Sequence, residues 1–162
     1  MTLSRFYVAP IEEATFSGAE AKHCTQALRK CVGDQVIVFD GAGTEATAEI
    51  TTISSKRVEL KILERRQTPA PAVSISLIQA IPKGANMEWV LEKAVDLGVN
   101  AIFPVLTERR VVRLDAREAA KKQEKWQRVA LEACKQCGQN WLPQVHEPAS
   151  FLSVLETLPV HD

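Results

Sequence analysis

The sequence predicts an α/β protein whose N-terminal part is β-rich. Three observations predict this fold class. Short alternating runs separated by turn residues fill residues 1–63. Residues 64–72, ERRQTPAPA, carry two prolines among alanines and charges and indicate a short extended linker. Residues 73–107 then read as apolar strand, amphipathic helix and apolar strand, the pattern of a parallel sheet. We therefore expect a small β unit at 1–63, a linker at 64–72 and an α/β unit at 73–162.

The composition restricts the class of protein. The chain has 162 residues, 46% hydrophobic content and zero formal net charge, which fits one or two globular domains without a global nucleic-acid or membrane signature. The longest apolar run is too short to span a bilayer, and the N-terminus lacks a signal-peptide pattern. Four cysteines without such a signal indicate free thiols in a reducing compartment. We expect a soluble cytoplasmic protein.

The elements of the first unit follow from local signals. RFYV is typical of a short strand, and QVIVF, EATAEITTI and RVELKIL are typical of further strands. Ser17 with Glu20 forms a capping box that predicts a helix to about Lys30, ending near Gly33. The segment from Asp40 to Gly43 predicts a tight hairpin turn. Several short antiparallel strands with one helix favour a compact barrel, closed to hide its edges.

The second unit opens with the predicted strand–helix–strand segment. Asn86 is a plausible N-cap, and Gly98 stands where the helix needs a left-handed residue. The loop after the first strand holds Lys83 and lies at the carboxyl edge of the sheet, where ligands of open α/β sheets bind. Glu88 follows on the helix near the same edge. The alternative for Lys83 is a solvated lysine in a turn.

A long helix is predicted from Asp115, which forms a capping box with Glu118, to Cys137, with Gly138 as its stop. Its expected buried stripe is Trp126, Val129, Ala130, Ala133, Cys134 and Cys137. Residues 109–135 contain nine Lys and Arg against four Asp and Glu, a local excess of five that could attract a phosphate backbone. A solvated helix face explains the same excess. A short strand between Pro143 and Pro148 and a last helix follow, so we expect an α/β domain that lacks its last third.

The remaining clusters of cysteine, histidine and arginine are weaker candidates for a functional site. Cys134 and Cys137 form a C-x-x-C pair at a helix C-terminus, where the dipole disfavours a thiolate, so buried small side chains are the better interpretation than redox or metal chemistry. No metal site and no catalytic residue are assigned. His23 and Arg29 lie near each other in the first helix, and with Arg5 they could form a basic surface on the β unit. A structural role is the alternative for each.

Residues scattered over nearly the whole chain match one family in unbroken order. They are RFYV, His23, Leu28-Arg29, Asp40-Gly41, Ala80-Ile81-Pro82-Lys83-Gly84, Met87-Glu88, Glu92-Lys93-Ala94, Asp96-Leu97-Gly98-Val99, Phe103-Pro104, Lys125-Trp126, Glu132-Ala133-Cys134, Gln136-Cys137-Gly138 and Pro143. In this pattern the chain resembles the RsmE-type family of bacterial 16S ribosomal RNA (uracil-N3) methyltransferases. It departs from the family at Lys135 and Gln139, where relatives commonly carry an acid and an arginine, and at Asp96, where they carry Glu.

The resemblance implies a PUA-like small barrel at 1–63, followed by a partial SPOUT domain of the trefoil-knot class at 73–162 that lacks its knot. It implies methyl transfer from S-adenosylmethionine to N3 of a uridine, with the cofactor site expected beyond Asp162. We take Arg5, His23, Arg29, Arg109 and Arg110 as candidates for RNA contact, and Lys83 and Glu88 as candidates at the sheet edge.

The resemblance also implies a homodimer that pairs through the knot region, whereas this chain, which we expect to lack the knot, could be a monomer. The expected partner is 16S ribosomal RNA or the small ribosomal subunit, with no membrane. An alternative function is a non-catalytic RNA-binding or ribosome-assembly module, and a third is a small redox protein using the C-x-x-C pair.

Overall fold

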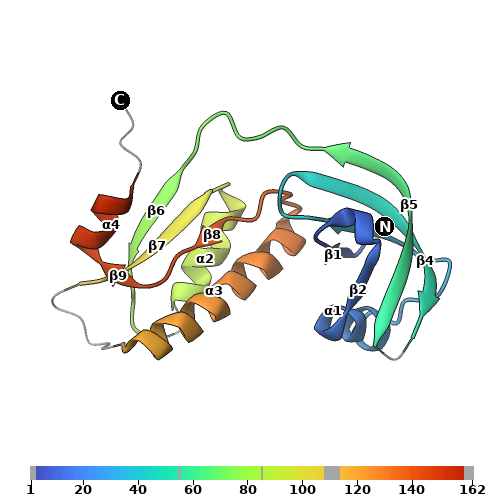
Figure 1. Cartoon of the computed structure of the whole chain (residues 1–162), viewed down its shortest axis with the longest axis horizontal. Coiled ribbons are helices and arrows are strands. Elements are labelled where there is room, and N and C mark those ends of the chain that lie inside the picture. Colours follow the sequence, from blue (N-terminus) through green and yellow to red (C-terminus); the bar gives the residue numbers. More distant parts are fainter. Residues whose placement is uncertain (1–2, 55, 85, 108–113, 159–162) are drawn as a thin grey trace. The chain divides into compact units, whose positions relative to one another are not determined.

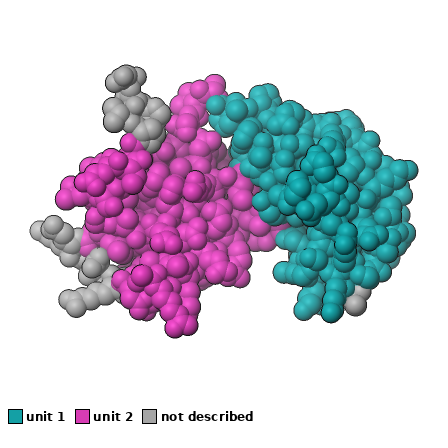
Figure 2. Space-filling model, in the orientation of Figure 1, with its two compact units in different colours: residues 1–71, 138–141 teal, residues 72–137, 142–162 magenta. Residues whose placement is uncertain are grey.

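A computed structural model describes residues 3–54, 56–84, 86–107 and 114–158. The chain divides into two compact units. Unit 1 comprises residues 1–71 with 138–141, and unit 2 comprises residues 72–137 with 142–162 (Figure 2). Among the described residues, no helix is both long enough and apolar enough to cross a membrane.

Unit 1 is built on a curled five-stranded sheet in the order β1-β3-β4-β5-β2 (Figure 1). The strands are β1 Arg5–Tyr7, β2 Thr15–Ser17, β3 Gln35–Phe39, β4 Thr44–Ile53 and β5 Arg57–Gln67. All neighbouring pairs are antiparallel except β1 and β3, which are parallel. The predicted strands are thus present, and β2 is a strand that the sequence did not reveal.

The sheet is a half-barrel, so the expectation of a closed barrel is wrong. Within the described residues the two outer strands, β1 and β2, are not paired with each other. Side chains of the two strands are in contact instead: the rings of Phe6 in β1 and Phe16 in β2 stack with centroids 4.7 Å apart and planes 11° apart. Offset stacking of this kind adds to the area that the rings bury. The core is therefore sealed by packing where the hydrogen-bond ladder stops.

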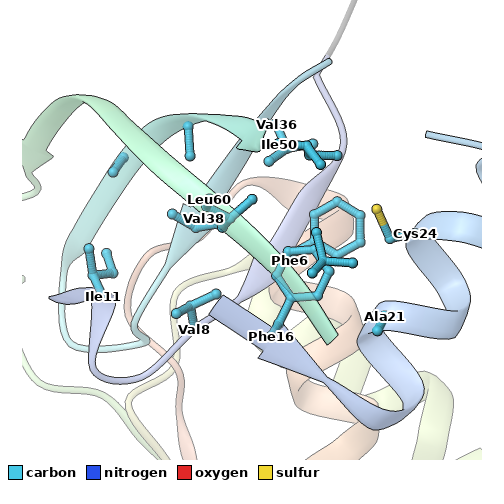
Figure 3. Packing of buried hydrophobic residues seen from close by; sticks show 13 residues of the cluster. Phe6, Val8, Ile11, Phe16, Ala21, Cys24, Val36, Val38, Ile50 and Leu60 are labelled. Carbon is cyan, nitrogen blue, oxygen red and sulfur yellow. The ribbon is translucent and has the colours of Figure 1, made fainter. Parts of the chain in front are cut away.

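The core of unit 1 comes from alternate positions of the strands. Ala46, Ala48 and Ile50 of β4 are fully buried, as expected where every second residue of a strand faces the interior. Figure 3 shows side chains from the strands and the helix gathered in this cluster, with Phe6 beside Phe16. Cys24 closes the helix side of the cluster.

The first helix is shorter than predicted. Helix α1 spans Gly18–Lys22 and continues as a π-helical turn, His23–Ala27. The predicted capping box is wrong, because in the described structure the Ser17 side chain makes no capping hydrogen bond and Gly18 enters the helix at φ +61°. The hydroxyl of Thr25 donates to the carbonyl of Ala21 at 2.8 Å, a local bond that competes with helix hydrogen bonding.

The turn between β3 and β4 forms as predicted. Oδ1 of Asp40 accepts hydrogen bonds from the backbone N–H of Ala42 at 2.7 Å and of Thr44 at 3.0 Å. Strand β5, however, continues to Gln67, which pairs with Thr44. Residues 64–67 therefore belong to the sheet and not to the linker, because they pair with β4 in the backbone hydrogen-bond ladder.

Unit 2 contains a parallel sheet in the order β6-β7-β8, with β9 also paired to β7 (Figure 1). Its elements are β6 Ser76–Ala80, α2 Asn86–Asp96, β7 Ala101–Leu106, α3 Ala116–Cys137, β8 Gln144–Val145, β9 Ala149–Ser150 and α4 Phe151–Thr157. The predicted strand–helix–strand segment is confirmed, with Gly98 at φ +79° ending α2. The apolar run of β6 is typical of a strand buried on both faces, but β6 is at the edge of the described sheet, and Ser76 and Ala80 are exposed.

Helices cover the sheet on two sides. Phe103 and Val105 of β7 pack with Val154 of α4. Because side chains alternate along a strand, Ile102 points to the opposite face and is fully buried there. Helices α2 and α3 pack against each other. The predicted capping box of α3 is confirmed, since Asp115 Oδ1 accepts from the Glu118 N–H at 2.8 Å and Glu118 Oε2 accepts from the Asp115 N–H at 3.1 Å.

The segment Gly138–Trp141 leaves α3 and joins unit 1. Asn140 is 7% exposed, its carbonyl accepts from the Gly43 N–H at 2.9 Å, and its side-chain Nδ2 donates to the Thr68 hydroxyl at 2.8 Å. The indole N–H of Trp141 donates to the carbonyl of Pro69 at 3.1 Å. We call residues 138–141 the clasp. Four residues of the expected second unit are therefore part of the first.

Candidate functional site

Arg5 lies inside unit 1 and not on its basic surface. Its guanidinium pairs with Glu45 at 2.6 Å, donates to Asn140 Oδ1 at 2.6 Å and lies 4.8 Å from the centre of the Phe39 ring. Only 12% of the side chain is exposed. Alternation along β1 places Arg5 opposite Phe6, whose ring meets His23 edge-on at 6.3 Å. The structure therefore separates Arg5 from the other two candidates and gives it an internal ion pair.

His23 and Arg29 are both exposed at the helix end of unit 1. His23 begins the π-helical turn, and Arg29 follows that turn with φ +51°, in the left-handed region that a side chain rarely occupies. Residues 21–33 contain Lys22, His23, Arg29 and Lys30 and no acidic residue. A cluster of cations on a fixed support is the electrostatic footprint that attracts phosphates.

The carboxyl edge of the unit 2 sheet holds the second group of candidates. Strands β6 and β7 are parallel, so the loop with Lys83 after β6 and Thr107 after β7 follow strand ends at the same edge. Lys83 is exposed there. Arg109 and Arg110 lie outside the described residues. Glu88 of α2 pairs with Lys125 of α3, so its carboxylate ties the two helices together.

A small pocket opens beside this ion pair, with a volume of about 120 Å³. Its walls are Ile81, Pro82, Gly84, Met87, Glu88, Lys122, Lys125 and Trp126. The Lys122 ammonium lies 5.5 Å from the centre of the buried Trp126 ring, an arrangement that favours a cation. Lys83, Lys122 and Lys125 against Glu88 give this edge three positive charges and one negative charge. The arrangement can hold an anionic group such as a phosphate.

Lys122, Trp126 and Asn140 were not among the predicted site residues. Lys122 falls within the basic stretch counted from the sequence, so the charge excess was the available signal. No local pattern marks Asn140, because its partners Arg5, Gly43 and Thr68 are at least 72 positions away.

A larger hollow of about 790 Å³ lies along α2 and α3. Three acidic and three basic side chains line it: Glu92, Asp96, Glu132, Lys93, Lys125 and Arg128. A hydrogen bond from Lys93 to Asp96 at 2.7 Å raises the pKa of the lysine. Lys125 and Arg128 pair with carboxylates outside the hollow, those of Glu88 and Glu124. A lining of both signs, with its cations already paired, favours a solvated helix surface over an anion site.

The cysteines do not form a reactive pair. All four are free thiols, as the sequence predicted, and Cys134 and Cys137 close α3 at its C-terminus. Cys134 is fully buried, whereas Cys137 is exposed, so its predicted burial was wrong. Burial raises the pKa of the Cys24 thiol. Among the described residues, no three His, Cys, Asp or Glu side chains are grouped to hold a metal ion.

Two family profiles cover most of the chain. Residues 16–63 match the RNA methyltransferase PUA domain, and residues 68–162 match the RNA methyltransferase domain. The ribosomal RNA small subunit methyltransferases E of Bacillus subtilis and Synechocystis are 35% and 32% identical to the chain, each over 94% of its length. The chain covers 61% and 50% of these two curated relatives, less than two thirds of their length.

Solved structures show the same fold. The ribosomal RNA small subunit methyltransferase E of Neisseria gonorrhoeae, bound to S-adenosyl methionine, matches with a TM-score of 0.86 and 34% identity over 98% of this chain and 67% of its own. A Legionella pneumophila methyltransferase in complex with the same cofactor matches with a TM-score of 0.86 and 30% identity over 99% of this chain and 69% of its own. With its PUA-like half-barrel followed by a parallel α/β sheet, this chain belongs to the RsmE family of ribosomal RNA methyltransferases.

Proposed function

We propose that the chain takes part in methylation of N3 of a uridine in 16S ribosomal RNA, with S-adenosylmethionine as methyl donor. The observation that carries this proposal is the pair of cationic sites on a family fold: the His23–Lys30 surface of unit 1 and the lysine-lined edge of unit 2. Relatives of known structure are bound to S-adenosylmethionine. The free thiols agree with a cytoplasmic location beside the ribosome.

The chemistry divides between substrate and cofactor. N3 of uridine carries a proton that must leave before a methyl group can replace it, and the nitrogen is inaccessible while the base is paired. S-adenosylmethionine supplies the electrophilic methyl group when it is bound. The residues of this chain would hold the RNA backbone: His23 and Arg29 on unit 1, and Lys83 and Lys122 at the sheet edge, with Arg109 and Arg110 proposed to join them. Glu88 would position Lys125.

We further propose that residues 73–162 form the first part of a SPOUT domain. The match of residues 68–162 to the RNA methyltransferase domain supports this proposal.

Two measurements test the proposed function. Fluorescence anisotropy with a labelled fragment of 16S ribosomal RNA should give an affinity that falls with salt, because bound cations release counterions from phosphates. Methyl transfer from S-adenosylmethionine should be assayed with the protein expressed from the gene's full reading frame. Primer extension on the treated RNA should then stop at the N3-methylated uridine. Absence of RNA binding at low salt would contradict the proposal. Binding without methyl transfer would favour the non-catalytic RNA-binding or assembly module instead.

A further inference from the structure

The loop after the π-helical turn exposes apolar side chains among its cations. Leu28 is 38% exposed and Val32 is 61% exposed, and Arg29 and Lys30 lie between them in the chain. Single exposed apolar side chains are common on protein surfaces, so it is the combination with neighbouring cations on a fixed support that indicates a contact surface here. This loop, residues 28–33, is the one we consider further.

Hydrogen bonds hold the loop in place at both ends. The Leu28 N–H donates to the His23 carbonyl at 3.0 Å, and the Lys30 N–H donates to the Cys24 carbonyl at 3.0 Å. The Cys31 N–H donates to Asp34 Oδ2 at 2.8 Å, and the Gly33 N–H donates to the Ile50 carbonyl of β4 at 2.8 Å. The left-handed conformation of Arg29 is thus maintained by its surroundings. A preorganised loop loses little conformational freedom on binding.

The composition of the loop indicates how it would contact a nucleic acid. Residues 21–33 hold Lys22, Arg29 and Lys30, and of the two flanking acids, Glu20 and Asp34, the second accepts from the Cys31 N–H. This excess of basic side chains suits a phosphate backbone. Residues 21–33 also hold no Phe, Tyr or Trp, so this segment offers no ring on which a base could stack. Aliphatic side chains contact nucleic acids in another way, by entering between bases and separating them.

We infer that Leu28 and Val32 form an apolar wedge that enters an unstacked step of the RNA, while Arg29 and Lys30 contact the flanking phosphates. The inference rests on the proposed function, because it names the form of RNA that the unit 1 surface selects: a single-stranded or locally unpaired segment. Methylation at N3 needs an unpaired uridine, and a wedge stabilises a base that has left its stack. A regular duplex offers the loop phosphates but no opening for its apolar side chains.

The test compares two RNAs of equal length and charge. One is a hairpin with an unpaired uridine flanked by 2-aminopurine, whose fluorescence rises on unstacking, and the other is the fully paired duplex. The wild-type chain should prefer the unpaired RNA and raise its fluorescence. Leu28→Ser with Val32→Ser should reduce affinity for the unpaired RNA about tenfold, leave duplex affinity nearly unchanged and abolish the fluorescence rise.

Three further variants separate the effects. Leu63→Ser replaces another exposed apolar residue of unit 1, 44% exposed on β5, and should behave as wild type. Val32→Ser alone tests the wedge if the double variant melts at a lower temperature. Arg29→Gly removes the guanidinium while favouring the left-handed backbone, so it should weaken binding to both RNAs equally.

The outcomes are distinguishable. A wild-type chain that binds neither RNA overturns the proposed function as well as the wedge. Salt-dependent binding without preference for the unpaired RNA, or a fluorescence rise that persists in both Val32 variants, overturns the wedge alone. Contact of this loop with a ribosomal protein in place of RNA would give that second result.

Discussion

The Arg5 guanidinium lies 2.6 Å from Oδ1 of Asn140, although 135 positions separate the two residues in the chain. The same guanidinium pairs with Glu45 at 2.6 Å. A residue that the sequence offered as an RNA contact is therefore committed to holding the clasp and the sheet together. This distinction between an internal cation and a surface cation can be measured.

Arg5→Ala should affect stability, whereas Arg29→Ala should affect RNA binding. Arg5→Ala leaves Glu45 and Asn140 without a donor, and we expect it to lower the free energy of unfolding by about 2 kcal/mol or more. Arg29→Ala should leave stability nearly unchanged and reduce the slope of log affinity against log salt by about 0.7–0.9, one phosphate contact. Denaturant titration and RNA binding in a salt series check both. A reduced slope in a stable Arg5→Ala chain would return Arg5 to the RNA surface.

Asn140→Ala should destabilise unit 1 by about 1–3 kcal/mol, because it removes the partners of the Arg5 guanidinium and of the Thr68 hydroxyl in a mostly buried place. Asn140→Asp keeps the acceptor for Arg5, and the Thr68 hydroxyl, which accepts from Asn140 Nδ2, can donate to the carboxylate in its place, so this variant should cost less. Gln26→Ala, at an exposed position of the π-helical turn, is the control. Equal melting temperatures for Asn140→Ala and the control would show that the clasp adds nothing to stability.

Gly43→Ala and Gly33→Ala form a matched pair, since the two glycines have φ of +95° and +93°. A Cβ on Gly43 would lie 2.5 Å from the Trp141 ring, whereas a Cβ on Gly33 meets open space. Backbone strain should lower the free energy of unfolding of both variants by about 1–2 kcal/mol. Overpacking against Trp141 should lower that of Gly43→Ala by about 1–3 kcal/mol more. Thermal unfolding compares them directly. Identical losses would mean that Trp141 moves aside without cost.

His146 should make stability fall in mild acid. Its ring stacks on Phe103 with centroids 4.1 Å apart, and burial lowers its pKa from the ordinary value of about 6.5. As the pH drops below about 6.5, the unfolded chain gains a proton that the folded chain resists, so stability is lost toward the lower folded pKa. Melting curves between pH 7.5 and 5.5 should show a smaller decline for His146→Gln. An unchanged decline would assign it to other groups.

S-adenosylmethionine should bind this chain weakly or not at all. The pocket at the described sheet edge has about 120 Å³, while sites for molecules of this class usually enclose ~300–1,000 Å³. The hollow along α2 and α3 reaches about 790 Å³, but charged side chains of both signs dominate its walls, whereas such sites are mostly apolar. Isothermal titration calorimetry with the 162-residue chain checks this, and Lys122→Ala is the companion variant. A micromolar dissociation constant, weakened by Lys122→Ala, would place the cofactor in this chain after all.

Local signals predicted the elements whose structure depends on neighbours in sequence. The Asp40 turn, the Asp115–Glu118 capping box and the left-handed Gly98 each rest on bonds within a few residues. The strand–helix–strand segment followed from apolar periodicity over residues 73–107. The missed features depend on distant partners: β2 is a strand because it pairs with β5, and β5 continues because it pairs with β4.

The candidate sites likewise contain features that the local sequence predicts and features that depend on the tertiary structure. Charge counts indicated the excess of cations over residues 109–135, because charge is a property of composition. They could not separate Arg5 from Arg29, since only the tertiary structure places a carboxylate and an amide oxygen against one and leaves the other exposed.

The clasp also affects how the protein can be divided. Because residues 138–141 belong to unit 1, the chain passes between the units three times, after residues 71, 137 and 141. Cutting once after Pro71 would strip the half-barrel of Asn140 and expose the surfaces that Arg5 and Gly43 present to it. An isolated N-terminal fragment is therefore an incomplete domain. A faithful version would need the GQNW tetrapeptide restored, either joined through a designed loop or added as a separate peptide.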